Sequence, residues 1–434
     1  MNTSPLSDII NSLSDKQIRW TRELVSIPTV NPYSGDQAPA GERAGQQWIE
    51  ARMRELGAKT RRIPVPQDIY TWAGLLGPCD RKWDGRESVV GEWVFGDGNG
   101  PTIVLNSHMD TVGVDDWDGD PFEAQLIEGK LHGRGASDSK GNLALGLIAL
   151  ETLMRTTDKL RGRVLFESVV DEECNGGGAG TLACCRAGIT GDAAIVLDGS
   201  AGRPYFRSNG IITPRITINA EAGHSAAASG AGALDLALAV HSAFTAFELD
   251  HRSRYPECRS SIGVFRAGTH PAVVPGKAEI VANIFYPFEE AAACERATGF
   301  FDGRRIRKRF EETIAGATES KCAGRTNTDV NVEWLKDLYP YRCDPDDALF
   351  LHARKAMSEV RADWGNIDLQ PAWSDATHLA RQLNKPVLGM GFGTPGQAHA
   401  TPEYAETDYL YQGTASVALL LQILLDPETG YRSK

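Results

Sequence analysis

Short apolar runs alternate with helix-type patterns over most of the chain. Four runs carry apolar side chains at almost every position, which is typical of strands buried on both faces of a sheet: 102–105, 163–170, 193–197 and 386–390. Apolar residues at helical spacing lie before and between these runs, at 8–25, 41–56, 142–154 and 175–187. This alternation predicts an α/β fold with a mainly parallel sheet covered by helices.

The middle third follows a different pattern. Alternating strands are expected at 211–219, 260–265, 278–286 and 329–334, and helices at 232–247 and 289–313. Their order, β-α-β-β-α-β, is that of a ferredoxin-like unit. Because the α/β pattern resumes afterwards, we predict two domains. Residues 1–209 and 338–434 form a split larger domain, and residues 210–337 form an inserted smaller one.

The segment 63–93 has no clear periodicity. It contains several aromatic residues, among them Tyr70, Trp72, Trp83 and Trp93. We interpret it as a long excursion that could cover a site or an interface.

Composition and charge exclude several classes of function. Lys and Arg number 45 against 57 Asp and Glu, a net charge of −12, which disfavours nucleic acid and anionic membranes as partners. No apolar run approaches the roughly 20 residues that cross a bilayer. The N-terminal residues lack the pattern of a secretory signal, and the eight cysteines contain no C-x-x-C pair. These features predict a cytoplasmic protein with free thiols.

Acids and histidines gather where the predicted strands end. His108 and Asp110 follow the first run, the triplet 171–173 follows the second, Asp198 follows the third, and His399 comes after the last. Asp138 lies in a glycine-rich connection. Ligands of α/β sheets bind beyond the carboxyl ends of the strands, so these side chains are expected at one edge. So many carboxylates repel one another unless divalent cations, such as Zn²⁺, are present.

Three other functions are alternatives to a metal-dependent one. A serine hydrolase is disfavoured because Ser137 and Ser225 only half match the G-x-S-x-G turn and leave the acids unexplained. A dinucleotide-binding enzyme is disfavoured because the glycines at 96–100 precede a strand instead of joining a strand to a helix. A non-catalytic binding protein on the same fold remains the third alternative.

The motifs taken together resemble the dinuclear-zinc amidohydrolases and metallopeptidases, the family of aminoacylase, acetylornithine deacetylase, succinyl-diaminopimelate desuccinylase and carboxypeptidase G. The matching segments are SHMDTV (107–112), WDGDPF (117–122), GKLHGRGASDSKG (129–141), VDEECNGGGAGT (170–181), AGHSA (222–226), WSDA (373–376) and AHATPEY (398–404). The resemblance implies a zinc-peptidase-like sheet domain interrupted by a ferredoxin-like lid, through which the protein is expected to form a homodimer. We call residues 210–337 the lid.

The resemblance also implies the roles of individual residues. Two divalent ions, most simply Zn²⁺ with Co²⁺ or Mn²⁺ as alternatives, would be held by His108 and Asp198, by Glu173 and His399, and by a bridging Asp138. Glu172 would be the general base, Asp110 would orient His108, and His224 would stabilise the oxyanion.

The expected substrate is a small N-acyl amino acid or a related amide. The alternative is a dipeptide or small peptide, cleaved as by a dipeptidase or carboxypeptidase. Asn283 is the candidate substrate contact of the lid, but the family's usual arginine is absent at 285, where this chain has phenylalanine. Arg207 or Arg266 could replace it. We therefore expect a bulkier or dipeptide-like amide.

Overall fold

The central sheet is built largely from the apolar runs predicted as buried strands. The computed structural model describes residues 5–36, 40–78, 80–173, 176–199, 201–226, 232–323, 328–366, 368–428 and 430–431. Among these residues the sheet order is β1 (Lys59–Pro64), β2 (Glu87–Phe95), β6 (Gly162–Val169), β3 (Thr102–His108), β7 (Ala193–Val196), β17 (Val387–Gly389), β8 (Tyr205–Ser208) and β15 (Tyr341–Arg342), with β16 (Asp368–Gln370) beside β8. The middle strands β6, β3, β7 and β17 are parallel, and antiparallel strands flank them.

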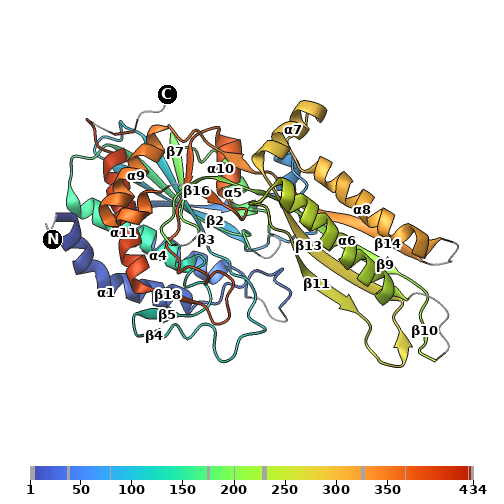
Figure 1. Cartoon of the computed structure of the whole chain (residues 1–434). Helices are drawn as coiled ribbons and strands as arrows, with labels where there is room; N and C mark the ends of the chain where they lie inside the picture. The colour runs from blue at the N-terminus through green and yellow to red at the C-terminus, as the bar shows by residue number, and fades with distance from the viewer. Residues whose placement is uncertain are drawn as a thin grey trace.

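Helices cover both faces of this sheet (Figure 1). One face packs against α1 (Pro5–Val25), α2 (Arg43–Glu55), α4 (Lys140–Thr156), α9 (Ala348–Val360) and α11 (Thr407–Leu424), and the other against α3 (Ile69–Trp72), α5 (Ala179–Arg186) and α10 (Ala376–Leu383). Successive residues of β3 serve the two faces, since Ile103 and Leu105 join one apolar cluster and Val104 another. This two-sided burial explains the continuous apolar runs and confirms the predicted fold class.

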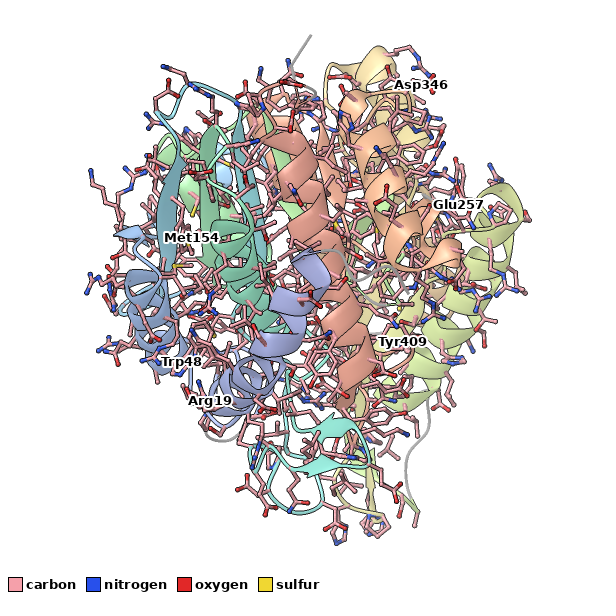
Figure 2. The ribbon with its side chains drawn as sticks, turned by 90° about the vertical axis from the view of Figure 1, so that its left-hand side faces the viewer. Arg19, Trp48, Met154, Glu257, Asp346 and Tyr409 are labelled. Atoms are coloured by element: carbon pink, nitrogen blue, oxygen red, sulfur yellow. The ribbon has the colours of Figure 1, made fainter. Side chains whose placement is uncertain are left out.

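Figure 2 looks onto the first face, with Arg19 of α1, Met154 of α4 and Tyr409 of α11 labelled. A one-turn helix, η1 (Ala362–Gly365), follows α9 there. A small sheet of β4 (Leu126–Ile127), β5 (Lys130–His132) and β18 (Tyr404–Glu406) lies below these helices in Figure 1. None of the described helices combines the length and apolar character that a membrane crossing requires.

The lid is a four-stranded antiparallel sheet with helices on one face. Its order is β11 (Ser261–Ala267), β13 (Lys277–Tyr286), β9 (Gly210–Asn219) and β14 (Asp329–Leu338), the order of a ferredoxin-like unit. Alternate residues such as Ile216 and Ile280 pack against α6 (Ala233–Arg254) and α8 (Arg304–Cys322). A two-stranded ribbon of β10 (Gly223–His224) and β12 (Val273–Val274) forms the end of the lid farthest from the central sheet (Figure 1).

Three predicted elements differ from the structure. The helix expected at 289–313 is two helices, α7 (Phe288–Thr298) and α8, because Gly299 ends the first in the left-handed conformation with φ +79°. The helix expected at 175–187 begins only at Ala179, after Gly178 with φ +66°, and Asn175 lies outside the described residues. The segment 63–93 is not merely an excursion, since it contains α3 and most of β2.

Candidate active site

The predicted acids and histidines meet at the carboxyl edge of the parallel strands. His108 is the last residue of β3, Asp171 to Glu173 follow β6, and Asp198 follows β7. Asp138 precedes α4, and His399 lies in the loop between β17 and β18. Five separate segments of the chain therefore deliver side chains to one place, as strand-end chemistry in an α/β sheet requires.

These side chains form three groups whose nitrogen and oxygen atoms could hold a cation. In each group the ligand atoms lie within 4.8 Å of one another: His108 with Asp138 and Asp198, His108 with Glu172 and Glu173, and Asp138 with Glu173 and His399. His108 Nε2 is 3.0 Å from Asp138 Oδ1, and His399 Nε2 is 3.0 Å from Glu173 Oε2. Asp138 thus belongs to two of the groups, and its second oxygen is 3.6 Å from His399 Nε2.

The electrostatics of these groups suit divalent cations. Burial raises the pKa of Asp198 to about 7, with the charge of Asp138 adding to the effect. The pKa of His108 is raised well above its usual value, because nearby carboxylates outweigh the opposing effect of burial. The charge of Glu173 likewise raises the pKa of His399. Protons are therefore retained where negative charge is concentrated, and divalent cations bound by nitrogen and carboxylate oxygen would replace them.

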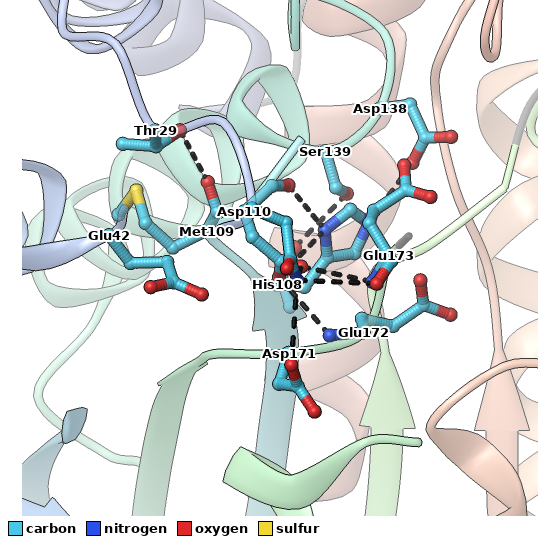
Figure 3. A network of polar contacts seen from close by, with 12 residues as sticks. Thr29, Glu42, His108, Met109, Asp110, Asp138, Ser139, Asp171, Glu172 and Glu173 are labelled. Atoms are coloured by element: carbon cyan, nitrogen blue, oxygen red, sulfur yellow. Dashed lines mark hydrogen bonds and ion pairs between the residues drawn. The ribbon is translucent and has the colours of Figure 1, made fainter. Parts of the chain in front are cut away.

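His108 is oriented by the main chain of Asp110 (Figure 3). Its Nδ1 lies 2.9 Å from the carbonyl oxygen of Asp110, whereas the nearer carboxylate oxygen is 3.8 Å away. The role of the Asp110 carboxylate in orienting this ring therefore stays a prediction. That carboxylate accepts from the backbone N–H groups of Glu172, at 3.2 Å, and Glu173, at 3.0 Å. It also accepts from Asn31 Nδ2 at 2.8 Å. Asp110 fixes the acidic turn.

Glu172 differs from its neighbours in having a free carboxylate. It is half-buried and lines the cavity described below, and no hydrogen bond to its carboxylate is formed within the described part of the chain. Burial raises the pKa of Glu172 well above its usual value, although the charge of His108 opposes this. A carboxyl group with a raised pKa can hold and release a proton near neutral pH, which is what a general base needs.

A buried ion network supports the acidic turn from below. Asp171 has φ +69° and is fully buried. Its two carboxylate oxygens accept from Arg86 Nη2 at 3.0 Å and from the Tyr70 hydroxyl at 2.9 Å. Arg86 also pairs with buried Glu42. The segment 63–93 thus holds the site in place from beneath, and sequence reasoning missed Arg86 and Glu42 because no motif marks them.

Glu403 supports the loop that carries Asp138. Its buried carboxylate accepts from the backbone N–H groups of Gly135, at 2.9 Å, and Ser137, at 2.8 Å, and pairs with Arg134 Nη1 at 2.9 Å. Glu403 lies in the motif quoted above for the resemblance (398–404), but its role emerges only from these contacts. The loop position of Asp138, whose backbone N–H also donates to Glu403 at 3.1 Å, is therefore set by a residue 265 positions away in the sequence.

A cavity of about 420 Å³ opens over this edge. Its described lining includes the acids and His399. It also includes a second set of residues, which we call the wall: Arg203, Pro204, Tyr205, Leu369, Gln370, Pro371, Ala372 and Trp373. A volume of this size suits a small molecule.

Two predicted site residues, His224 and Asn283, do not belong to the described lining of this cavity. His224 is exposed in β10, at the far end of the lid (Figure 1), where its Nδ1 accepts from the Ala226 N–H. Asn283 is half-buried in β13 and accepts from the Thr213 hydroxyl at 2.7 Å. Their roles stay predictions.

The sequence matches a described protein family over residues 104–423, and that family is Peptidase family M20/M25/M40. The chain belongs to this family. Members of the family include dinuclear metal-binding peptidases.

Relatives whose names describe amide hydrolysis match parts of this sequence. A Halalkalibacterium halodurans protein named N-formyl-4-amino-5-aminomethyl-2-methylpyrimidine deformylase is 32% identical over 48% of this chain and 44% of its own length. The match therefore spans less than half of that relative. The succinyl-diaminopimelate desuccinylase 2 of Shewanella loihica is 25% identical over 91% of this chain and 97% of its own length.

The fold of this M20 protein is also similar to solved structures. The dipeptidase Dug1p of Saccharomyces cerevisiae aligns with a TM-score of 0.77 at 16% identity, covering 96% of this chain and 97% of that one. At that identity the likeness concerns the fold alone.

Proposed function

We propose that this M20 protein is a metal-dependent hydrolase that cleaves the amide bond of a small N-acyl amino acid or a related amide. The observation that carries the proposal is that Asp138 belongs to two neighbouring ligand groups, with Glu172 beside them on the cavity wall. A carboxylate shared between two groups is what a pair of cations about 3.5–4 Å apart requires.

The ligands would divide between two ions. His108 and Asp198 would hold one, Glu173 and His399 would hold the other, and Asp138 belongs to a group with each pair. Imidazole nitrogen and carboxylate oxygen favour Zn²⁺, with Co²⁺ or Mn²⁺ as alternatives. When bound, such a pair supplies a water of low pKa and polarises the scissile carbonyl.

The protein's own residues then move the proton. Glu172 would accept it from the attacking water, because its carboxylate lines the cavity and accepts no hydrogen bond from the described residues. The same carboxyl group then donates the proton to the leaving nitrogen as the carbon–nitrogen bond breaks. Asp110 holds the backbone of Glu172 and Glu173 in place during both steps.

A homodimer formed through the lid is part of the proposal. The lid exposes apolar side chains on α6 and on β11, an edge strand of its sheet: Leu234, Leu238, Leu249 and Phe265. In such a dimer the His224 position of a second copy would complete the oxyanion site. A cytoplasmic location also remains part of the proposal, and it is supported by the free thiols of the described cysteines.

The test is Glu172→Gln, with Glu359→Gln as the matched control because Glu359 is exposed on α9. Both variants are loaded with Zn²⁺ and assayed on N-acyl amino acids, dipeptides and N-carbamoyl compounds. We expect Glu172→Gln to lower kcat by about 10²- to 10⁴-fold while its metal content equals that of the wild type. Unchanged kcat in this variant would refute Glu172 as the base.

A further inference from the structure

The cavity that the candidate metal ligands line also carries a positive charge. Arg203 lies in the loop between β7 and β8 and lines the cavity. Among the described residues of that lining it is the one Lys or Arg, whereas Asp138, Glu172, Glu173 and Asp198 line the same space. The described lining of the cavity therefore combines a group of acids with one guanidinium.

The guanidinium of Arg203 is exposed and makes no ion pair or hydrogen bond within the described part of the chain. Arg266, one of the arginines considered as a carboxylate ligand, differs in this respect because its Nη1 pairs with Glu279 at 3.0 Å. Neither Arg266 nor Arg207 belongs to the described cavity lining. Of these three arginines, only Arg203 is placed to meet a substrate.

The loop that carries Arg203 is pinned to the active-site edge. The backbone N–H of Ala201 donates to Gly393 O, and that of Gly202 donates to Gly391 O, both at 2.9 Å. Gly202 has φ +59° and lies against the ring of Trp364, so that a β-carbon there would collide with the indole. Arg203 is thus anchored at its base, and only its side chain is free to adjust.

The surface beside Arg203 is apolar and rigid. Pro204 and Pro371 have fixed φ angles, and Trp373 is 8% exposed. Trp373 packs with Ile211 and Leu338, where the lid joins the central sheet. Its ring centroid is 5.2 Å from that of His378. This surface suits the apolar body of a bound molecule.

We propose that Arg203 binds a carboxylate of the substrate and that the wall of Pro204, Pro371 and Trp373 holds the substrate's apolar body. The inference rests on the proposed function and specifies its substrate class. A guanidinium matches a carboxylate in shape and charge, and one cation matches one negative charge. With its anion at Arg203, the molecule places its amide beside Glu172 in the same cavity.

Binding of a carboxylate would distinguish the substrate of this protein from that of its deformylase relative. The compound named for that relative, an N-formyl aminomethylpyrimidine, contains no carboxylate in its printed name. A substrate of that kind would gain nothing from Arg203.

The experiment compares N-acetyl-L-phenylalanine with N-acetyl-L-phenylalaninamide, and a dipeptide with its C-terminal amide, on the Zn²⁺-loaded protein. Arg203→Gln is tested beside Arg207→Gln, a matched control on β8. We expect Arg203→Gln to raise KM for the carboxylates by about 10- to 100-fold with little change in kcat, because a hydrogen bond to a charged group is lost. The amides and the Arg207→Gln variant are expected to show no change, and Arg203→Lys a smaller rise.

Arg203→Gln overturns the proposal if it leaves KM unchanged for the carboxylates, or shifts acids and amides equally. The wild type could also hydrolyse none of the compounds, which would count against the proposed function. Calorimetric binding of the N-acetyl-L-phenylalanine pair to wild type and Arg203→Gln then tests the recognition separately. Preference of the wild type for the acid, abolished in the variant, supports the proposal, and equal binding of both compounds overturns it.

Discussion

In the lid, most charged side chains lie at the surface, and the apolar residues of β9 and β13 are buried against α6 and α8. At the carboxyl edge of the central sheet the arrangement is reversed. Asp110, Asp171 and Asp198 are buried there, next to one another. Burying carboxylates costs free energy unless they are paired, so this edge is organised at the expense of stability, as expected for a functional site.

The backbone shows the same difference. At the catalytic edge, Asp171 and His399 are two of the non-glycine residues that adopt left-handed conformations, with φ +69° and φ +60°. No described non-glycine residue of the lid does so. Such conformations cost about 1–3 kcal/mol each and persist where surrounding contacts enforce them. Arg86 and Tyr70 supply such contacts to Asp171.

The largest effect is expected from Asp138→Asn, with Glu279→Gln in the lid as the control. Because Asp138 belongs to two ligand groups, its loss should weaken the binding of both ions. Metal catalysis supplies several kcal/mol, so kcat/KM should fall by about 10³-fold or more, and the control should stay at the wild-type level. Steady-state kinetics with metal analysis measure this. Full activity of Asp138→Asn would contradict the proposal that the catalytic edge, unlike the lid, binds the metal ions.

A second expected difference concerns stability. Arg86→Ala leaves Glu42 and Asp171 buried without their partner, so the free energy of unfolding of the metal-free protein should fall by about 3–5 kcal/mol. Arg266→Ala breaks an exposed pair in the lid and should cost less than about 1 kcal/mol. Urea unfolding compares the two variants. Equal losses would show that burial does not distinguish these pairs.

The described part of the lid buries two acids, Glu290 and Asp337, and Asp337 gives a smaller and pH-dependent effect. Burial raises the pKa of Asp337 to about 6, although Arg307 opposes this. Between about pH 4 and pH 6 the folded state then binds more protons than the unfolded state, so stability falls as pH rises. This contribution amounts to at most about 2–3 kcal/mol.

Asp337→Asn should make the measured slope shallower, because buried carboxyls such as Asp198 still contribute to it, and Asp329→Asn, an exposed change on the same strand, should leave it unchanged. Urea unfolding of the metal-free protein across this pH range measures both. An unchanged slope in Asp337→Asn would assign it to the carboxylates of the catalytic edge instead.

The sequence predicted the fold class because β3, β6 and β7 are buried on both faces and therefore read as continuous apolar runs. It failed at α7 and α8 because helical periodicity continues across Gly299, whose left-handed conformation is decided locally. It also missed most of β2, whose mixed residues pair with β1 and β6 across long sequence separations.

The candidate site shows a similar division. His108, Asp138 and Asp198 could be predicted because each follows a recognisable strand or glycine-rich turn. Arg86, Glu42 and Glu403 could not be assigned, since a buried charge is identified by its partners and these come from distant segments. Arg203 could not be predicted because it lies in a loop without a motif, and only the fold brings that loop to the cavity.

We propose that the carboxyl edge of the central sheet holds two ions that share Asp138. The most direct measurement is titration of the metal-free protein with Zn²⁺, with bound metal counted per chain and amide hydrolysis followed in parallel. We predict that binding saturates at two ions per chain in the wild type and that activity depends on these ions. In Asp138→Asn we expect both the binding of the two ions and the activity to be lost. Full hydrolysis by metal-free protein in excess chelator, or two tightly bound ions in Asp138→Asn, would contradict the proposal.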